Sequence, residues 1–430
     1  MNTTAITLLL GSFACLIILR VPIAFSLGIS SVITAAYLHV PLAMMAQAMV
    51  RGINSFSLLA IPFFILAGEI MGEGGISQRL ITFSNVIVGR IRGGLALVNV
   101  LASMFFGGIS GSSVADTSSI GSILIPMMKK KGYDDDYSVA VTITGSTQGI
   151  LIPPSHNMII YSLVAGGVSV GRLFLAGMIP GIVLGLALML LSYIIAVRRG
   201  YPAGEPASLK TALIATKDAA LGLLTAVIVV GGVITGFYTA TEAAAVAAVY
   251  AFIVTFFIYR DIPLSKMSLI LMKSLKTLAI VMALIATSNA FGWLLAYLKV
   301  PALATKALLS ISSNKYVVLF VINILLLFLG CIMDMAPLIL ITTPILLPVA
   351  LQLGVDPVHF GIIMMLNLAI GLLTPPVGST LFVGCAIGNI SIEKLSRSMI
   401  PFYLTMIIVL MFITYVPQIV MFMPDLLMGK

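Results

Sequence analysis

The chain contains 430 residues, of which 60% are hydrophobic and only 9% are charged, and its mean hydropathy is +1.18. Soluble domains usually carry about 25% charged residues, so this composition excludes a soluble globular protein and predicts an all-α polytopic membrane protein. The net charge of +9 comes from single bases or short basic groups between apolar runs. That pattern is typical of loops that set membrane orientation and not of a nucleic-acid partner.

The first half of the chain predicts spans, a hairpin and a broken helix. Apolar spans cover residues 4–19, 22–40, 53–72 and 173–197, with a basic amphipathic stretch at 77–92. The element at 93–128 is interrupted by small residues at 107–113, and neither of its pieces has the roughly 20 residues of a spanning helix. We therefore expect a re-entrant hairpin at 93–128, followed by a helix over 137–165 that is broken at Pro153 and Pro154.

The second half predicts the same order of elements. Spans are expected at 219–236, 240–259 and 275–298, a hairpin at 315–350, a broken helix at 358–388 and a last span at 399–423. The polar residues 201–217 are expected to form a cytoplasmic linker between a first unit, 1–200, and a second unit, 218–430. Each half then contributes five full crossings and one hairpin that returns to its own side.

An internal repeat supports this division. Residues 108–169 align without gaps to 330–391 at an offset of 222 residues, with 12 of 62 positions identical, and Pro153 and Pro154 fall on Pro375 and Pro376. An odd number of crossings inverts the second repeat relative to the first, as in many transporters. Most Lys and Arg residues fall on the cytoplasmic side if the N-terminus lies outside. The exceptions are Arg51, Arg172, Lys299, Lys306 and Lys315.

The two hairpin tips and the two helix breaks are the candidate sites. Interrupted backbone inside a membrane must line a wet cavity or be buried in protein, and its carbonyl and amide ends suit a small cation and an anion. The alternative is a purely structural role, in which Gly, Ser and Pro permit kinks and close helix packing. His156 follows the first Pro pair and would either donate to an anion or respond to pH, but the absence of a second His nearby argues against a metal site.

Four carboxylates lie within apolar segments: Glu69, Asp116, Glu242 and Asp334. Placing a carboxylate inside the membrane costs free energy, so its presence there suggests a function. Asp116 and Asp334 follow the hairpin tips, where they would either hold a tip together or retain a cation. Structural roles are favoured for Glu69, near a helix end, and for Glu242, in the first turn of a helix capped by a preceding Thr. No nucleotide-binding motif or catalytic constellation occurs in the sequence, so we expect no enzyme activity.

Three segments resemble the large membrane subunit of tripartite ATP-independent periplasmic (TRAP) transporters, the DctM family. They are FFGGISGSSVADTSSIGSILIP at 105–126, TATEAAAVAA at 239–248 and GLLTPPVG at 371–378. The resemblance covers essentially the whole chain, with a small departure at Ala240, where the family usually has Pro. It implies a bacterial inner-membrane protein of the elevator type that imports organic acids, such as C4-dicarboxylates, keto acids, sugar acids or sialic acid, with Na⁺ as the coupling ion.

The resemblance also implies two partners and a set of site residues. The partners are a periplasmic substrate-binding protein and a small four-helix membrane subunit, here a separate chain because Met1 leads directly into the first span. The first sodium site would comprise Ser110, Gly111, Ser112, Ser113, Asp116, Gly149 and Pro153, and the second Met333, Asp334, Thr374, Pro375, Pro376 and Gly378. For the solute we expect Ser112, Ser155, His156, Asn157, Ser379 and Thr380.

Two alternatives remain open at this point. A stand-alone sodium-coupled dicarboxylate carrier or a sodium/proton antiporter would have a similar repeat architecture. A channel or a structural membrane scaffold is less favoured, because neither needs two broken-helix pairs. The identity of the solute is not readable from residues that suit many carboxylates.

Overall fold

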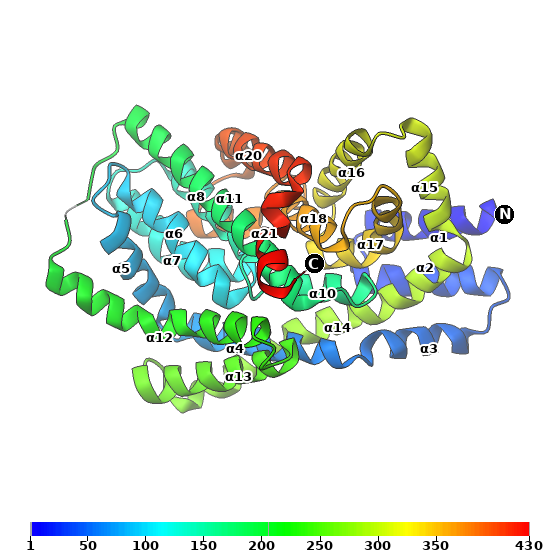
Figure 1. The fold of residues 1–430 in the computed structure, drawn as a ribbon, viewed down its shortest axis with the longest axis horizontal. Coiled ribbons are helices and arrows are strands. Elements are labelled where there is room, and N and C mark those ends of the chain that lie inside the picture. The colour runs from blue at the N-terminus through cyan, green and yellow to red at the C-terminus, as the bar shows by residue number, and fades with distance from the viewer. Residues whose placement is uncertain (1, 205, 430) are drawn as a thin grey trace.

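The computed structural model describes residues 2–204 and 206–429, and this part of the chain is helical throughout with no strand (Figure 1). The first half contains α1 (Thr3–Ile18), α2 (Ile23–Tyr37), α3 (Leu42–Ile53), α4 (Ala60–Glu73), α5 (Ile76–Val88), α6 (Gly94–Ser110), α7 (Ser113–Lys130), α8 (Asp135–Ser146), α9 (Gln148–Leu151), α10 (His156–Val164) and α11 (Val170–Arg199). A 3-10 turn, η1 (Phe56–Leu59), precedes α4.

The second half contains α12 (Leu209–Ile234), α13 (Ala240–Ile253), α14 (Met267–Tyr297), α15 (Val300–Ile311), α16 (Lys315–Gly330), α17 (Met335–Gln352), α18 (Pro357–Gly371), α19 (Ser379–Gly388), α20 (Ile392–Tyr415) and α21 (Pro417–Met428). A π-helical turn, η2 (Val254–Tyr259), continues α13, and a 3-10 turn, η3 (Leu264–Lys266), precedes α14.

Seven helical segments of the described chain are long and apolar enough to cross a membrane, fewer than the ten full crossings that we expected. They are Phe56–Glu73, Val170–Arg199, Leu209–Ile234, Ala240–Tyr259, Leu264–Tyr297, Met335–Gln352 and Ile392–Tyr415. α1 and α2 have 16 and 15 residues, which at 1.5 Å per residue is about 24 and 22 Å, short of a hydrocarbon core of about 30 Å. One of the seven, α17, is the second arm of the predicted second hairpin.

Several predicted boundaries were wrong. The linker is shorter than residues 201–217, because α12 already begins at Leu209, where the Ser208 side chain accepts a hydrogen bond from the Thr211 amide at 3.1 Å. The last span is divided at Val416 into α20 and α21, as expected of a helix that meets Pro417. The short helices α3 and α15 were not predicted at all.

Helix starts recur at a fixed spacing of 222 residues in the two halves. α7 and α17 have 18 residues each, and their N-caps are Ser112 and Asp334. α11 and α20 are both capped by a serine, Ser169 and Ser391, whose side chains accept from a backbone amide three residues later. Such side-chain acceptors satisfy amides that have no partner within the helix. The same local signal therefore starts α11 and α20, whereas Asp334, unlike Ser112, makes no side-chain capping bond.

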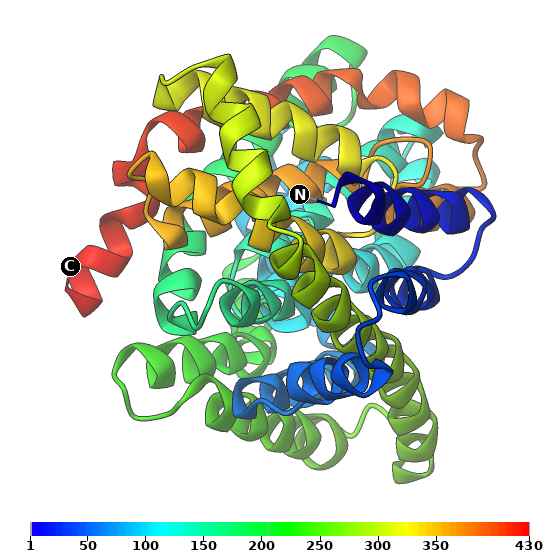
Figure 2. The same cartoon turned by 90° about the vertical axis from the view of Figure 1, so that its right-hand side faces the viewer.

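The N-terminal helices α1–α5 and the central helices α12–α14 pack together into one layer, which we call the frame. α4 packs against α13 and α14, α3 and α2 pack against α14, and α12 packs against α5 and α13. Figure 1 shows α12 and α13 with α4 and α5 along one edge, and Figure 2 shows α14 crossing beside the N-terminal helices. α15, α16 and α20 lie at the opposite edge (Figure 1). The first hairpin and the broken helices lie between these edges, together with α17, whereas α16, the first arm of the second hairpin, lies at the second edge.

Each broken helix packs against the hairpin of the other half. α10 contacts α17 and α18, while α19 contacts α7 and α8. On the first contact, the Tyr161 hydroxyl donates to the Pro357 carbonyl at 2.6 Å. On the second, a Cβ added to Gly384 would lie 2.4 Å from a methyl carbon of Ile143. The halves are therefore interlocked, and residues 267 positions apart can meet in one site.

The start of α8 is tied to the end of α11 by a polar cluster. The Asp134 carboxylate accepts from Arg199 and from the Tyr201 hydroxyl, both at 2.7 Å. These hydrogen bonds, that from Tyr201 foremost, lower the pKa of Asp134. A carboxyl group whose pKa is lower in the folded state stabilises the fold at any pH above its pKa in the unfolded chain, about 3.9. This stabilisation is lost as the pH falls through the pKa of the folded state.

We expect Asp134→Asn to reduce the free energy of unfolding by about 1 kcal/mol at pH 7, a small value because the side chain is half exposed. Thermal unfolding of the purified chain in detergent measures this effect, and the difference from the unmodified chain should shrink between pH 5 and the folded pKa. Glu393→Gln, in the first turn of α20, is the matched control. A loss that does not change with pH would contradict the ionic contribution.

Candidate functional site

The first hairpin tip lies directly on the first helix break. Gly111 has a φ of +60° between α6 and α7, and a Cβ placed there would come within 2.7 Å of the Pro154 carbonyl oxygen. A Cβ on Gly107 would lie 2.3 Å from the Cα atom of Gly149. Only glycine permits both approaches, and together they bring the tip backbone into contact with the interrupted segment between α9 and α10.

Polar atoms gather at this first junction. The Ser112 amide donates to the Ser110 hydroxyl at 3.3 Å, and the Ser112 hydroxyl accepts from the Ala115 amide at 3.4 Å. The Ser155 hydroxyl, in the break, is fully buried and has no hydrogen-bond partner in the described part of the chain. Because an unpartnered buried hydroxyl costs free energy, Ser155 has an oxygen available for a ligand.

The second tip and the second break make an equivalent junction. A Cβ on Gly371 would lie 2.6 Å from the Cα atom of Gly330, which repeats the close crossing of Gly107 and Gly149. The Val377 amide donates to the Cys331 carbonyl at 3.1 Å, and the Ser379 hydroxyl donates to the Asp334 carboxylate at 3.1 Å. Met333 is buried in this tip, whereas Asp334 is exposed.

A chain of buried hydroxyls joins the two halves. Ser113 and Ser146 are hydrogen bonded at 2.8 Å, Thr117 donates to Ser146 at 2.8 Å, and Thr380 donates to Ser113 at 3.1 Å. These residues come from α7, α8 and α19, so the first hairpin is bonded to the broken helices of both halves. All four hydroxyl residues are buried, so this contact between the halves is shielded from solvent.

The two tip carboxylates differ in their surroundings. Asp116 lies in the first turn of α7 with no exposed surface, and neither of its oxygens has a hydrogen-bond partner among the described residues. Asp334 is exposed, bonded to Ser379, and occupies the helix N-cap that corresponds to Ser112. Asp116 is therefore the carboxylate whose charge requires a cation or a proton, since burial of an isolated charge is costly.

Glu242 has a structural role, as its sequence context indicated. The Thr239 hydroxyl accepts from the Glu242 amide at 3.2 Å, and the Glu242 carboxylate accepts from the Thr239 amide at 2.8 Å. This reciprocal pair is a capping box at the start of α13.

The predicted site residues divide between the two junctions and the hydroxyl chain. Ser110 to Ser112, Gly149, Pro153 and Ser155 lie at the first junction, and Met333, Asp334, Thr374 to Pro376, Gly378 and Ser379 at the second. Ser113 and Thr380, predicted for different ligands, are hydrogen bonded to each other. His156 and Asn157 begin α10; His156 is half-buried and Asn157 is buried. Sequence reasoning missed Thr117 and Ser146, although Thr117 lies four residues after Ser113, on the same face of a helix.

The hydrogen bond from Thr380 to Ser113 leads to a stability prediction. Thr380→Val keeps the side-chain shape but removes the donor, so we expect a loss of about 1 kcal/mol in unfolding free energy. The control is Thr342→Val, whose hydroxyl is also buried but donates to the Leu338 carbonyl of its own helix at 2.6 Å. Thermal unfolding should show the larger loss for Thr380→Val, and equal losses would contradict a role in joining the halves.

A comparison with known protein families shows which family the chain belongs to. Residues 10–419 match the family described as the tripartite ATP-independent periplasmic transporter, DctM component. The chain belongs to this family. As a DctM component it is a multi-pass membrane protein and a transporter permease.

Relatives of this DctM component cover most of its length. The C4-dicarboxylate TRAP transporter large permease protein DctM of Pseudomonas aeruginosa is 42% identical over 86% of each chain. The sialic acid TRAP transporter large permease protein SiaM of Vibrio cholerae is 41% identical over 89% of this chain and 90% of its own. The isethionate TRAP transporter permease protein DctMQ of Oleidesulfovibrio alaskensis is 42% identical over 96% of this chain and 65% of its own.

A solved structure has the same overall fold as this DctM component. The YdaH transporter of Alcanivorax borkumensis matches with a TM-score of 0.60 over 89% of this chain and 88% of its own, at 12% sequence identity. At this identity the match concerns the fold alone.

Proposed function

We propose that the chain is the large membrane subunit of a sodium-coupled secondary transporter that imports an organic acid delivered by a periplasmic binding protein. The observation that carries this proposal is the pair of tip-to-break junctions linked by the hydroxyls of Ser113 and Thr380. Such a pair provides two equivalent sets of oxygen ligands around one buried centre. Membership in the DctM family supports the transport role.

Sodium is the proposed coupling ion because the junctions supply its preferred ligands. Hard cations bind oxygen, and both tips and breaks supply backbone carbonyls and hydroxyls, such as the hydroxyls of Ser110 and Ser112 at the first tip. The first ion would use Ser110 to Ser113, Gly149 and Pro153, with Asp116 balancing its charge. The second would use Met333, Asp334, Thr374 to Pro376 and Gly378.

An organic acid is the proposed solute because helices start at both breaks. α10 begins at His156 and α19 at Ser379, so their positive N-terminal ends point into the interrupted segments, where an anionic group is favoured. Ser112, Ser155, His156, Asn157, Ser379 and Thr380 would contact the solute. The named solutes of the three relatives, a C4-dicarboxylate, sialic acid and isethionate, are all organic acids.

The proposed mechanism is of the elevator type. The halves 1–200 and 218–430 are two inverted repeats, and their hairpins and broken helices move as one unit against the frame of α1–α5 and α12–α14. The recurrence of helix starts at a spacing of 222 residues and the interlocked packing of α10 and α19 support this division. The subunit resides in the bacterial inner membrane with a periplasmic N-terminus, and a small four-helix subunit and the binding protein complete the transporter.

Reconstitution tests this proposal. Proteoliposomes that contain the chain and its small subunit should accumulate radiolabelled solute only when the loaded binding protein and an inward sodium gradient are both present. Replacing Na⁺ by K⁺ outside should abolish uptake. Uptake by this chain alone, without binding protein or small subunit, would favour the stand-alone carrier, and proton release without solute uptake would favour the antiporter.

A further inference from the structure

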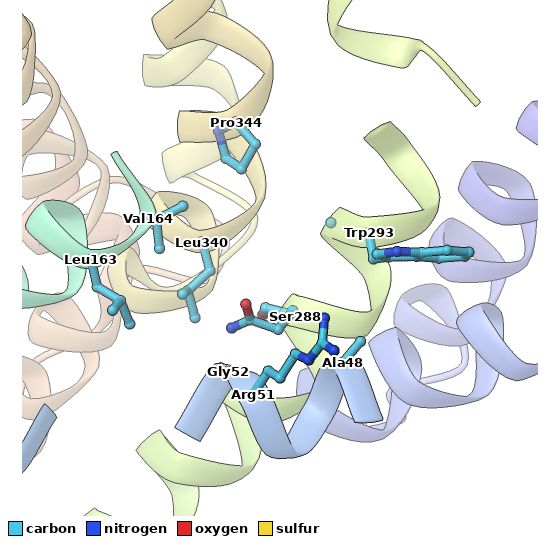
Figure 3. Close-up of a pocket in the computed structure, with 11 residues that line it drawn as sticks. Ala48, Arg51, Gly52, Leu163, Val164, Ser288, Trp293, Leu340 and Pro344 are labelled. Atoms are coloured by element: carbon cyan, nitrogen blue, oxygen red, sulfur yellow. The ribbon is translucent and has the colours of Figure 1, made fainter. Parts of the chain in front are cut away.

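A cavity of about 370 Å³ lies between the frame helices α3 and α14 and the helices α10 and α17, which belong to the hairpins and broken helices that we call the hairpin unit (Figure 3). One wall is formed by α3 and α14 and carries Arg51, Ser288 and Asn289. The facing wall is formed by α10 and α17 and is apolar, with Leu163, Val164 and Leu340. The volume lies in the range of small-molecule sites, about 300–1,000 Å³. We call this space the Arg51 cavity.

The polar wall has the chemistry of an anion site. Arg51 is exposed and forms no ion pair with any described carboxylate, and no acidic residue lines the cavity. The Ser288 side chain is only 3% exposed, and its hydroxyl has no hydrogen-bond partner among the described residues. Asn289 uses one amide proton on the Ile285 carbonyl at 2.9 Å, which leaves a second. A planar guanidinium with neighbouring neutral donors suits a carboxylate or sulfonate.

The position of Arg51 in the sequence supports this chemistry. Arg51 is one of the few bases that depart from the charge pattern expected from the sequence for an external N-terminus. It lies in the last turn of α3, where a cation is also favoured by the helix dipole. The dipole accounts for a positive charge but not for the unpartnered hydroxyl of Ser288 beside it.

The cavity is connected to the first junction by a single short helix. α10 starts at His156, immediately after the break, and has nine residues that end at Val164 in the cavity wall. At 1.5 Å per residue the cavity lies about 12 Å along this helix from the break. Its two walls belong to the frame and to the hairpin unit, so any sliding of one against the other must reshape it.

We propose that the Arg51 cavity is a second subsite that binds the acid group of the transported solute, with Arg51, Ser288 and Asn289 as donors and the apolar wall facing the rest of the molecule. This inference rests on the proposed function, because it concerns the same organic acid before it reaches the junctions. The subsite concentrates the anion beside the helix that leads to the central site.

The only tryptophan of the chain, Trp293, also lines the cavity and reports on its occupancy. The full-length chain in nanodiscs of zwitterionic lipid is titrated with succinate, isethionate and N-acetylneuraminate while its tryptophan emission is followed. We expect a saturable change in emission with at least one acid. The apparent affinity for that acid should be at least tenfold lower in Arg51→Gln, and it should also be lower in Ser288→Ala. Arg51→Lys, which keeps the charge, should be intermediate, and Lys306→Gln, outside the cavity, should match the unmodified chain.

A transport assay can tell whether this inference alone is wrong or whether the proposed function is wrong as well. In proteoliposomes with the small subunit and binding protein, Arg51→Gln should raise the KM for solute while its sodium dependence stays unchanged. Sodium-driven uptake with an unaltered KM and an unaltered emission titration in Arg51→Gln would overturn the subsite and leave the function intact. No sodium-driven uptake in the unmodified transporter would overturn the function. An emission change caused by added phosphatidylglycerol and by none of the acids would assign the cavity to a lipid headgroup and overturn the solute site.

Discussion

Gly149→Ala is expected to reduce sodium-driven uptake to background and to lower the thermal unfolding temperature. The added Cβ would lie 2.6 Å from the Cα atom of Gly107, which is a backbone atom and cannot rotate away. α6 and α9 would have to separate, at a cost of about 1–3 kcal/mol or more, and the first tip would leave the first break. Uptake and unfolding of the same purified preparation measure both effects.

Two further alanine variants make this prediction specific. Gly371→Ala should have the same effect, because its Cβ would lie 2.6 Å from the Cα atom of Gly330 at the second junction. Gly231→Ala, in the interior of α12, meets nothing within 4 Å and should be neutral or stabilising by up to about 1 kcal/mol. Normal uptake by Gly149→Ala would show that the close crossing is not needed for transport.

Asp116→Asn is expected to abolish uptake while leaving the chain as stable as before or more stable. The substitution preserves shape but removes a buried charge that has no partner in the described structure, and removal of such a charge relieves its desolvation cost. A coupling ion that depends on this charge would no longer be held. Uptake as a function of sodium concentration, with binding of radioactive Na⁺ to the purified chain, measures the loss.

The control for Asp116→Asn is Glu242→Gln, which alters an exposed capping carboxylate and should leave uptake and sodium dependence unchanged. Asp116→Ala should behave as Asp116→Asn does, with retained expression. Wild-type sodium dependence in both Asp116 variants would assign this carboxylate a purely structural role, and a lower unfolding temperature with normal uptake would do the same.

The sequence allowed prediction of the features that depend on local chemistry. Two consecutive prolines, Pro153 and Pro154, remove two backbone donors and disfavour a continuous helix, so the break between α9 and α10 could be predicted from these residues. Small residues at 107–113 likewise predicted the end of α6 and the start of α7. These signals act within a few residues and do not require knowledge of the tertiary packing.

Features that depend on packing could not be predicted. α3 and α15 have 12 residues each and contain bases among apolar side chains, so they resemble loops when only long apolar runs are sought. The hydrogen bond between Ser113 and Thr380 joins residues 267 positions apart, and it depends on how α19 is rotated against α7. The cavity at Arg51 was missed for the same reason, because Ser288 and Leu163 become neighbours only when α14 and α10 are placed.

α10 and α19 each pack against helices of the other half, and this packing has a consequence for biosynthesis. When the ribosome has completed the first half, α7 and α8 are made but α19 is still about 180 residues away along the chain, at roughly 5–20 residues per second. During that interval Ser113 lacks the hydroxyl of Thr380 and Tyr161 lacks the carbonyl of Pro357. The nascent first half therefore lacks these contacts between the halves until α18 and α19 have been made.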